Sequence, residues 1–248
     1  TITALTLDMS AAGAASFNST IASGKVAITG ATATSEASHV TFTNTQGAKV
    51  FAVGGGQSGV TNNGFVIRNV TDNTFPLVIS DDGSLSTPTA GTDNVRFGEN
   101  AGNSIASGGI RNVLIGKNAG TAITTGDSNV AVGWEALKTE DTHANSVAIG
   151  ASALATQNAG ADAYNVAVGY NAGTAITTGI LNTLIGGLAG DAITTGANNV
   201  ALGFEALTTN TGSNANVAIG FETLESFNVT ADTSTFNTAV GTQAGKAM

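Results

Sequence analysis

The stretch Asn129-Val-Ala-Val-Gly133 decides how this chain folds, because variants of it return throughout the later part of the sequence. Each copy has a polar residue, three mostly aliphatic residues and a glycine. The nine copies lie at 94–98, 112–116, 129–133, 146–150, 165–169, 182–186, 199–203, 216–220 and 237–241. Successive closing glycines are 17 to 21 residues apart. A near-constant period of this length predicts a solenoid of stacked coils.

Within one copy, the alternation of side chains along a strand assigns each position a role. Val166 and Val168 share one face and are predicted to point into the core, whereas Ala167 lies on the opposite face and permits close approach. Gly169 ends the strand. A second strand is expected around 175–177, so that each coil of about 17 residues has two short strands and two turns.

The same roles apply to the opening stretch. Val130 and Val132 are predicted core residues, and Gly133 leaves the strand. Asn129 belongs to a column of asparagines that recurs from coil to coil. Because asparagine side chains satisfy turns and stacked amides form ladders, this column is predicted to be structural, with a polar binding strip as the alternative.

The second half of the coil occurs in two versions. Ala-Ile-Thr-Thr-Gly is found without change at 122–126, 175–179 and 192–196. Other coils carry Glu-Ala-Leu instead, at 135–137 and 205–207.

Residues 1–90 lack the repeat. Alternating apolar residues predict one hairpin over 39–53, with its turn near 44–47, and another over 64–79, with its turn at 72–73. Shorter strands are expected at 1–7 and 17–29. Since a lone hairpin is marginally stable in water, these units are expected to need a core shared between several chains.

The composition argues against several partners. The formal net charge is −9 with only 8 Lys and Arg, so neither nucleic acid nor an anionic membrane surface is an expected partner. Cysteine is absent, which excludes disulfides and thiolate metal sites. No apolar run approaches the roughly 20 residues that a membrane-spanning helix needs, so membrane insertion is not expected.

Three stretches resemble known families. Asn145-Ser-Val-Ala-Ile-Gly150 resembles the signature of the head of trimeric autotransporter adhesins (YadA-type), which implies a parallel β-roll. The stretch 165–173 is similar to repeats of phage tail-fibre and tailspike proteins, and 5–18 resembles the opening of their shaft modules. The resemblance implies an all-β homotrimer, with an intertwined β shaft over 1–90 and a β-roll, or β-solenoid, of nine coils over 91–248.

The shaft-like beginning favours a structural phage tail fibre over the adhesin. The expected function is therefore attachment of a virion to a host surface, with a host glycan or protein receptor and other virion tail proteins as partners. The alternative is the head of a bacterial trimeric adhesin on the cell surface. A polysaccharide-degrading tailspike is less favoured, because the chain lacks the long coils and acid-rich grooves of such enzymes, and we expect no enzymatic activity.

The position after the closing glycine holds an aromatic residue in four coils, which are Trp134, Tyr170, Phe204 and Phe221. Aromatic residues in register are candidates for receptor contact, for example as a track on which sugars stack. The alternative is that they point inward, towards the core or a trimer axis. The longest departures from the period, 151–164 and 221–236, are further candidates for contact because extra residues in a solenoid form loops.

The candidates for chemistry are weak. Glu135, Glu205 and Glu222 share a column and are predicted to be solvated rather than catalytic. His39 and His143 are the only histidines and lie in different segments. Glu140-Asp141 suits a turn and lacks the spacing of a calcium loop. No catalytic residue, cofactor or metal is expected.

Overall fold

The structure is a computed structural model that describes residues 39–44, 49–55, 65–69, 74–79, 85–86, 91, 93–231 and 233–247. These residues form β-strands, turns, bends and loops, and they include no helix. The predicted all-β class is therefore confirmed for the part of the chain that is described.

Strands β1 to β5 form an antiparallel sheet in sequence order. Their bounds are His39–Asn44, Lys49–Gly55, Phe65–Asn69, Thr74–Ile79 and Leu85–Ser86. Both predicted hairpins are present, since β1 pairs with β2 and β3 with β4. They are not separate units, because β2 also pairs with β3. The strands expected at 1–7 and 17–29 lie outside the described residues.

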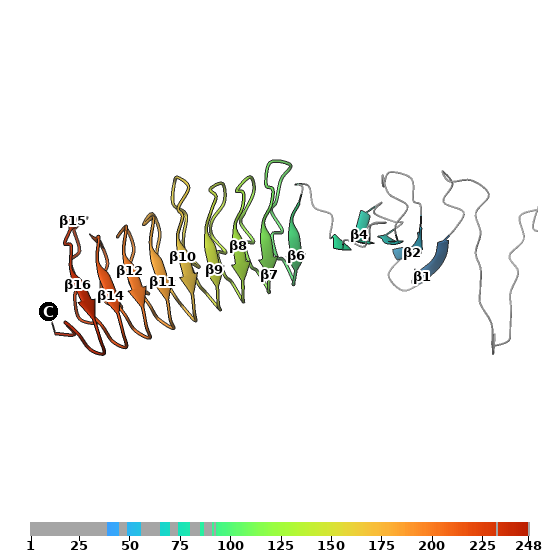
Figure 1. Ribbon diagram of the computed structural model, residues 1–248. Coiled ribbons are helices and arrows are strands. Elements are labelled where there is room, and N and C mark those ends of the chain that lie inside the picture. Colours follow the sequence, from blue (N-terminus) through green and yellow to red (C-terminus); the bar gives the residue numbers. More distant parts are fainter. Residues whose placement is uncertain are drawn as a thin grey trace, which may run out of the picture.

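The nine repeats form one parallel sheet in which each strand has three residues. The strands are β6 Val95–Phe97, β7 Val113–Ile115, β8 Val130–Val132, β9 Val147–Ile149, β10 Val166–Val168, β11 Thr183–Ile185, β12 Val200–Leu202, β14 Val217–Ile219 and β16 Thr238–Val240. They stand side by side in Figure 1, and equivalent residues are partners, such as Ala131 and Ala148. The predicted parallel β-solenoid of nine coils is confirmed.

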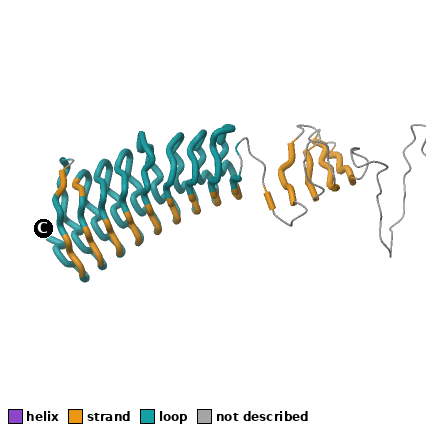
Figure 2. Tube along the Cα trace, turned by 45° about the horizontal axis from the view of Figure 1, so that its top comes forward, coloured by secondary structure: helices purple, strands orange, loops and turns teal. Residues whose placement is uncertain are grey.

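The prediction of a second strand in every coil is wrong. Residues 175–177 form turns and bends, and most of each coil outside the main sheet is loop, as Figure 2 shows. A second short ladder occurs only near the C-terminal end of the described solenoid, where β13 (Ser213–Asn214) pairs with β15 (Thr233–Ser234). In this part of the coil, single backbone amides donate to carbonyls of the next coil, such as Thr177 N to Thr194 O at 2.9 Å. These bonds are not consecutive along the chain, so turns form in place of a strand.

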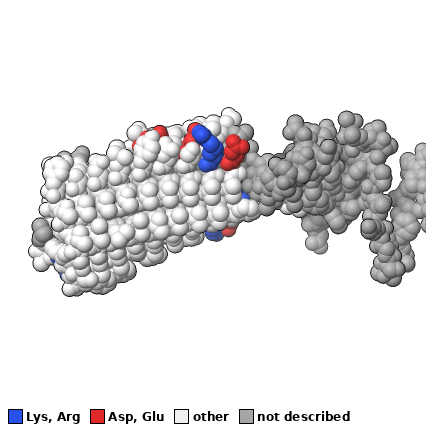
Figure 3. All heavy atoms as spheres, in the orientation of Figure 1, with Lys and Arg blue, Asp and Glu red and all other residues white. Residues whose placement is uncertain are grey.

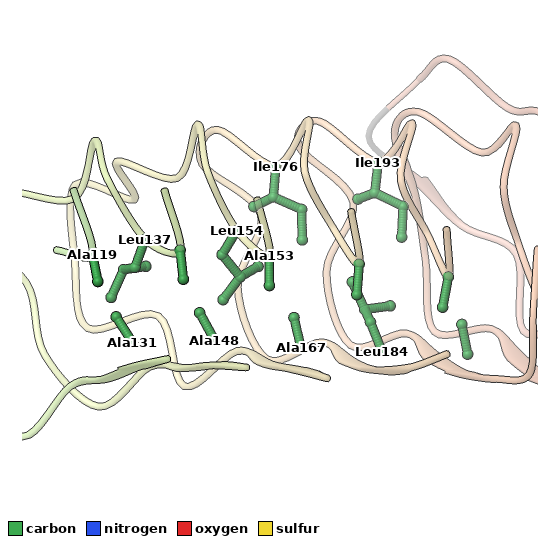
Figure 4. Packing of buried hydrophobic residues seen from close by; sticks show 14 of the residues in the cluster. Ala119, Ala131, Leu137, Ala148, Ala153, Leu154, Ala167, Ile176, Leu184 and Ile193 are labelled. Carbon is green, nitrogen blue, oxygen red and sulfur yellow. The ribbon is translucent and has the colours of Figure 1, made fainter. Parts of the chain in front are cut away.

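The inward and outward faces of the strand are the reverse of the sequence prediction. Ala131 and Ala167 are fully buried in the solenoid interior, whereas Val130, Val132, Val166 and Val168 face outward and are half-buried. Figure 4 shows the alanines of the strand wall facing larger side chains from the rest of the coil, such as Leu137 and Ile176. In the coils with a central alanine, the opposite wall fills the interior and leaves room for a methyl group on the strand. In the second and sixth coils, Leu114 and Leu184 of the strand are fully buried there instead.

The two versions of the second half-coil fill the same interior space in different ways. Four coils have a glycine at the fourth position after the closing glycine and an isoleucine three residues later. These pairs are Gly102–Ile105, Gly120–Ile123, Gly173–Ile176 and Gly190–Ile193. The other coils carry a buried leucine instead, and three residues later Glu140, Gln157, Asn210 or Phe227. A Cβ on Gly120 would lie 2.6 Å from Leu114 Cδ2 and 2.8 Å from Ile123 Cδ1, so a larger side chain here would compete with these two for the same space.

The closing glycines allow the coils to stack. Gly169 has φ +142°, and a Cβ on it would lie 2.3 Å from the carbonyl oxygen of Gly186 in the next coil. The backbones of neighbouring coils therefore approach within a distance that any side chain would prevent.

Candidate functional site

The outward face of the nine-stranded sheet is the main apolar surface of the described chain. Fourteen large apolar side chains are exposed there, and every one is an outward strand residue, the residue before the Asn column or the residue after the closing glycine. They are Val95, Phe97, Ile115, Trp134, Ile149, Tyr164, Tyr170, Leu181, Ile185, Leu202, Phe204, Phe221, Phe236 and Val240. We call this surface the sheet face.

The sheet face is long and regular. Nine strands at a spacing of about 4.8 Å extend for about 38 Å. In Figure 3, the visible side of the solenoid carries few charged side chains, and they lie mainly along its upper edge. A continuous apolar stripe of this length is typical of an interaction surface rather than of a surface in contact with water.

The four aromatic candidates lie on one edge of the sheet face. Trp134, Tyr170, Phe204 and Phe221 are exposed by 52%, 62%, 46% and 44%. The alternative in which they point into the core of their own coil is therefore wrong, because the closing glycine turns the chain away from the strand before the aromatic residue. We call these four residues the aromatic column.

The aromatic column is not filled in every coil. Ala151 lies between Trp134 and Tyr170, and Gly187 lies between Tyr170 and Phe204. Phe204 leans over the glycine, because a Cβ on Gly187 would lie 3.3 Å from its Cδ2 atom. Phe204 and Phe221 stack with ring centroids 5.9 Å apart. The column thus offers apolar rings with gaps between them.

The asparagine column is buried and forms a ladder. The backbone N–H and the Nδ2 group of Asn199 both donate to Oδ1 of Asn182, and Asn182 Nδ2 also donates to Gly196 O at 2.9 Å. The ladder amides are thus bonded to the neighbouring coil and to their own turn. A polar binding strip at this column would require side chains that reach solvent, and from Asn112 to Asn216 they do not.

The ladder is interrupted where Ser146 replaces the asparagine. Gln157 bridges the gap, since its Nε2 donates to Ser146 Oγ and Glu140 Oε2, both at 2.9 Å, and its Oε1 accepts from Asn165 Nδ2. Glu140 is fully buried, and its Oε1 accepts from His143 Nδ1 at 2.7 Å. The sequence prediction treated Glu140 as a turn residue and missed this buried cluster. Two features of the sequence could have indicated the cluster. Ser146 stands in the asparagine column, and Glu140 and Gln157 stand where other coils have isoleucine.

The glutamate column is half-buried rather than fully solvated. Glu135 pairs with Lys138 at 2.5 Å, and Glu222 pairs with Lys246. Hydrogen bonds from Lys246 and then Gln243 hold the pKa of Glu222 below its ordinary value. A glycosidase acid needs a raised pKa, so the environment of Glu222 is unlike that of a general acid.

The remaining candidates are placed as follows. The segment 151–164 is part of the solenoid wall, because its residues Ala155, Gln157 and Ala163 are buried. The described part of 221–236 includes strand β15. His39 lies in β1, and its side chain is outside the described part of the structure.

Comparison with known proteins places the chain in no family, because no family model, curated protein or solved structure matches it. Within the described residues, no helix is long and apolar enough to span a membrane.

Proposed function

We propose that this chain is a segment of a homotrimeric virion fibre, of the tail-fibre kind, that contacts a host cell surface. The observation that carries the proposal is the sheet face. It concentrates the exposed large apolar side chains of the described chain on one flat side of an elongated solenoid. Such a surface is stabilised when a second copy of the same surface covers it.

Three copies around a common axis are a closed arrangement that buries the sheet face of each copy. The resemblance of the repeat to trimeric adhesin heads and phage fibres supports three copies rather than two. The same axis continues into an intertwined shaft over 1–90, where the described strands β1 to β5 supply short antiparallel segments.

Light scattering on the purified chain tests the oligomeric state. Three chains of 24.3 kDa give 3 × 24.3 = 72.9 kDa. A folded species with the mass of one chain contradicts the proposed assembly, and a mass of two chains contradicts the trimer while leaving the sheet face as the interface.

The aromatic column is the proposed receptor contact. It lies at an edge of the sheet face, where copies packed around an axis leave side chains at the outer boundary of the interface. Aromatic rings bind the apolar faces of sugars and of protein side chains without any charge, which suits a glycan or a protein receptor.

Binding of the fluorescent chain to host cells tests this contact. Trp134→Ala and Tyr170→Ala are expected to reduce binding while the mass in solution stays the same. Tyr164→Ala is the matched control, because Tyr164 is equally exposed on the opposite edge of the sheet face. A variant that loses trimer mass instead shows that the column belongs to the interface.

The alternative is the head of a bacterial trimeric adhesin, which shares the repeat and the self-association. Immunogold labelling with antibodies against this chain distinguishes the two, because the label lies on phage tails in one case and on the cell surface in the other. The third candidate, a tailspike enzyme, predicts new reducing ends when the chain is incubated with host capsule. We propose that none form.

A further inference from the structure

We infer that Glu140, Asp141 and His143 form a binding site for one divalent transition-metal ion of the zinc class in each chain. Each residue offers one ligand atom, and these atoms all lie within 4.8 Å of one another. The inference does not depend on the proposed function, because it concerns one loop of the third coil.

The distances suit a small tetrahedral ion. Zinc binds imidazole nitrogen and carboxylate oxygen at about 2.0–2.2 Å, so ligand atoms around it are about 3.4 Å apart. His143 Nδ1 is 2.7 Å from Glu140 Oε1 and 4.0 Å from Asp141 Oδ1. These distances bracket the required value, and side-chain shifts of less than about 1 Å bring all three atoms to it. One imidazole with two carboxylates is a ligand set that favours zinc over calcium or magnesium.

The ligands are held in place by contacts with neighbouring coils and within their own coil. Gln157 Nε2 donates to Glu140 Oε2, which orients the other oxygen towards the histidine. The backbone carbonyl of Asp141 accepts from Thr124 N at 2.7 Å, and that of His143 accepts from Asn129 Nδ2 at 2.9 Å. Outer contacts of this kind fix the orientation of metal ligands and are part of most metal sites.

The local charge favours a cation. Glu140 is a fully buried carboxylate, and its ion-pair partner in the described structure is His143. Asp141 adds a second carboxylate, whereas the nearby Lys138 is paired with Glu135. A divalent ion neutralises both carboxylates, while a proton on the histidine neutralises one. A buried charge is stabilised by a close opposite charge, so the pair of carboxylates favours a divalent cation at this position.

The site is reachable from solvent. The side chain of Asp141 is 45% exposed and that of His143 is 19% exposed. An ion therefore enters from the Asp141 side, and the fourth coordination position is left to water. The bound ion links the loop to the buried Glu140–Gln157 bridge that spans the interruption of the asparagine ladder.

Calorimetric titration of the chelator-treated full chain with ZnCl₂ tests the site. We expect a saturable isotherm with one ion bound per chain. Saturating zinc is expected to raise Tm by roughly 3–6 °C. Co²⁺ in the same site is expected to show the strong visible absorption of tetrahedral coordination.

The variants separate this site from adventitious binding. His143→Gln keeps an amide donor for Glu140 but cannot replace the imidazole ligand, and Asp141→Asn removes one carboxylate from an exposed position. Each is expected to weaken zinc binding at least about tenfold. Asp162→Asn and His39→Ala are controls outside the cluster and are expected to bind zinc as the parent chain does. No binding to the parent, or equal binding by H143Q, D141N and the parent, overturns the site.

Discussion

The backbone N–H of Asn199 and its side-chain Nδ2 both donate to Oδ1 of Asn182, at 3.0 and 3.1 Å. One side-chain oxygen thus holds two donors of the next coil. Because the interaction repeats down the stack, the asparagine column ties neighbouring coils together through buried amides, except at Ser146, where Gln157 bridges the gap.

Asn182→Asp tests this ladder. Aspartate keeps the acceptor but cannot donate to Gly196 O, and it places an unpaired charge at a fully buried position. We expect a loss of about 3–5 kcal/mol in unfolding free energy at pH 7, measured by urea unfolding. Asn198→Asp adds the same charge at an exposed asparagine of the next coil and is expected to change stability little. An equal loss of unfolding free energy in N182D and N198D would show that the buried ladder amide contributes no more to stability than an exposed asparagine.

Gly169→Ala tests the stacking distance of the coils. The new Cβ would lie 2.3 Å from Gly186 O, at a backbone φ of +142°. We expect a loss of more than about 3 kcal/mol, because both the contact and the conformation are unfavourable. Gly160→Ala is the control, since Gly160 also has a positive φ of +72° but nothing within 4 Å. It is expected to cost about 1–2 kcal/mol, and thermal unfolding of both variants makes the comparison.

Leu207→Gly with Asn210→Ile tests the two coil versions. The double variant gives the seventh coil the arrangement of the fifth, where Gly173 and Ile176 accompany an alanine in the strand. Leu207→Gly alone leaves a cavity and is expected to cost about 3–5 kcal/mol, and Asn210→Ile alone crowds the leucine. The double variant is expected to recover at least about 1 kcal/mol relative to the sum. Additive losses in the cycle would mean that the two positions do not share the interior space.

Leu202→Glu tests whether the sheet face is the interface between chains. A charge in the middle of an apolar contact prevents association, so if the parent is the proposed trimer, the mass from light scattering is expected to fall from three chains towards one. Thr125→Glu is the control, since Thr125 is exposed and lies outside the sheet face. An unchanged trimer in L202E would place the interface elsewhere.

Asp191→Asn tests a pH effect. Burial raises the pKa of Asp191, against hydrogen bonds from Thr208 and from backbone amides that lower it. Since its folded-state pKa exceeds the unfolded value, the folded chain holds the proton more tightly, and stability falls as pH rises from the ordinary pKa through the raised one. Asparagine keeps the acceptor for Thr208 without the charge. The variant is expected to have a higher Tm than the parent at pH 7, with the difference shrinking as pH falls through this window.

Much of the solenoid was predictable because its signals are local. The spacing of the glycines from Gly98 to Gly241 predicts the coils, and the alternation in 39–53 and 64–79 predicts the hairpins. The buried cluster of Glu140, Gln157 and His143 was not predictable from any one segment, because its residues come from two coils and meet only after stacking.

The sequence by itself determined that the chain is a β-solenoid with a strand at each copy of the repeat, since a period, a turn residue and an obligatory glycine need no partner to be recognised. That the rest of most coils is turn and loop rather than a second strand was decided by the tertiary structure. Only the tertiary structure decided which side of the strand is inside. Alternation separates Val166 and Val168 from Ala167 but is unchanged when the two faces are exchanged. The leucines and isoleucines of the opposite wall fill the interior, so the alanine turns inward and the valines form an apolar outer face. That outcome places an apolar sheet face beside the aromatic residues that the sequence offered as contacts.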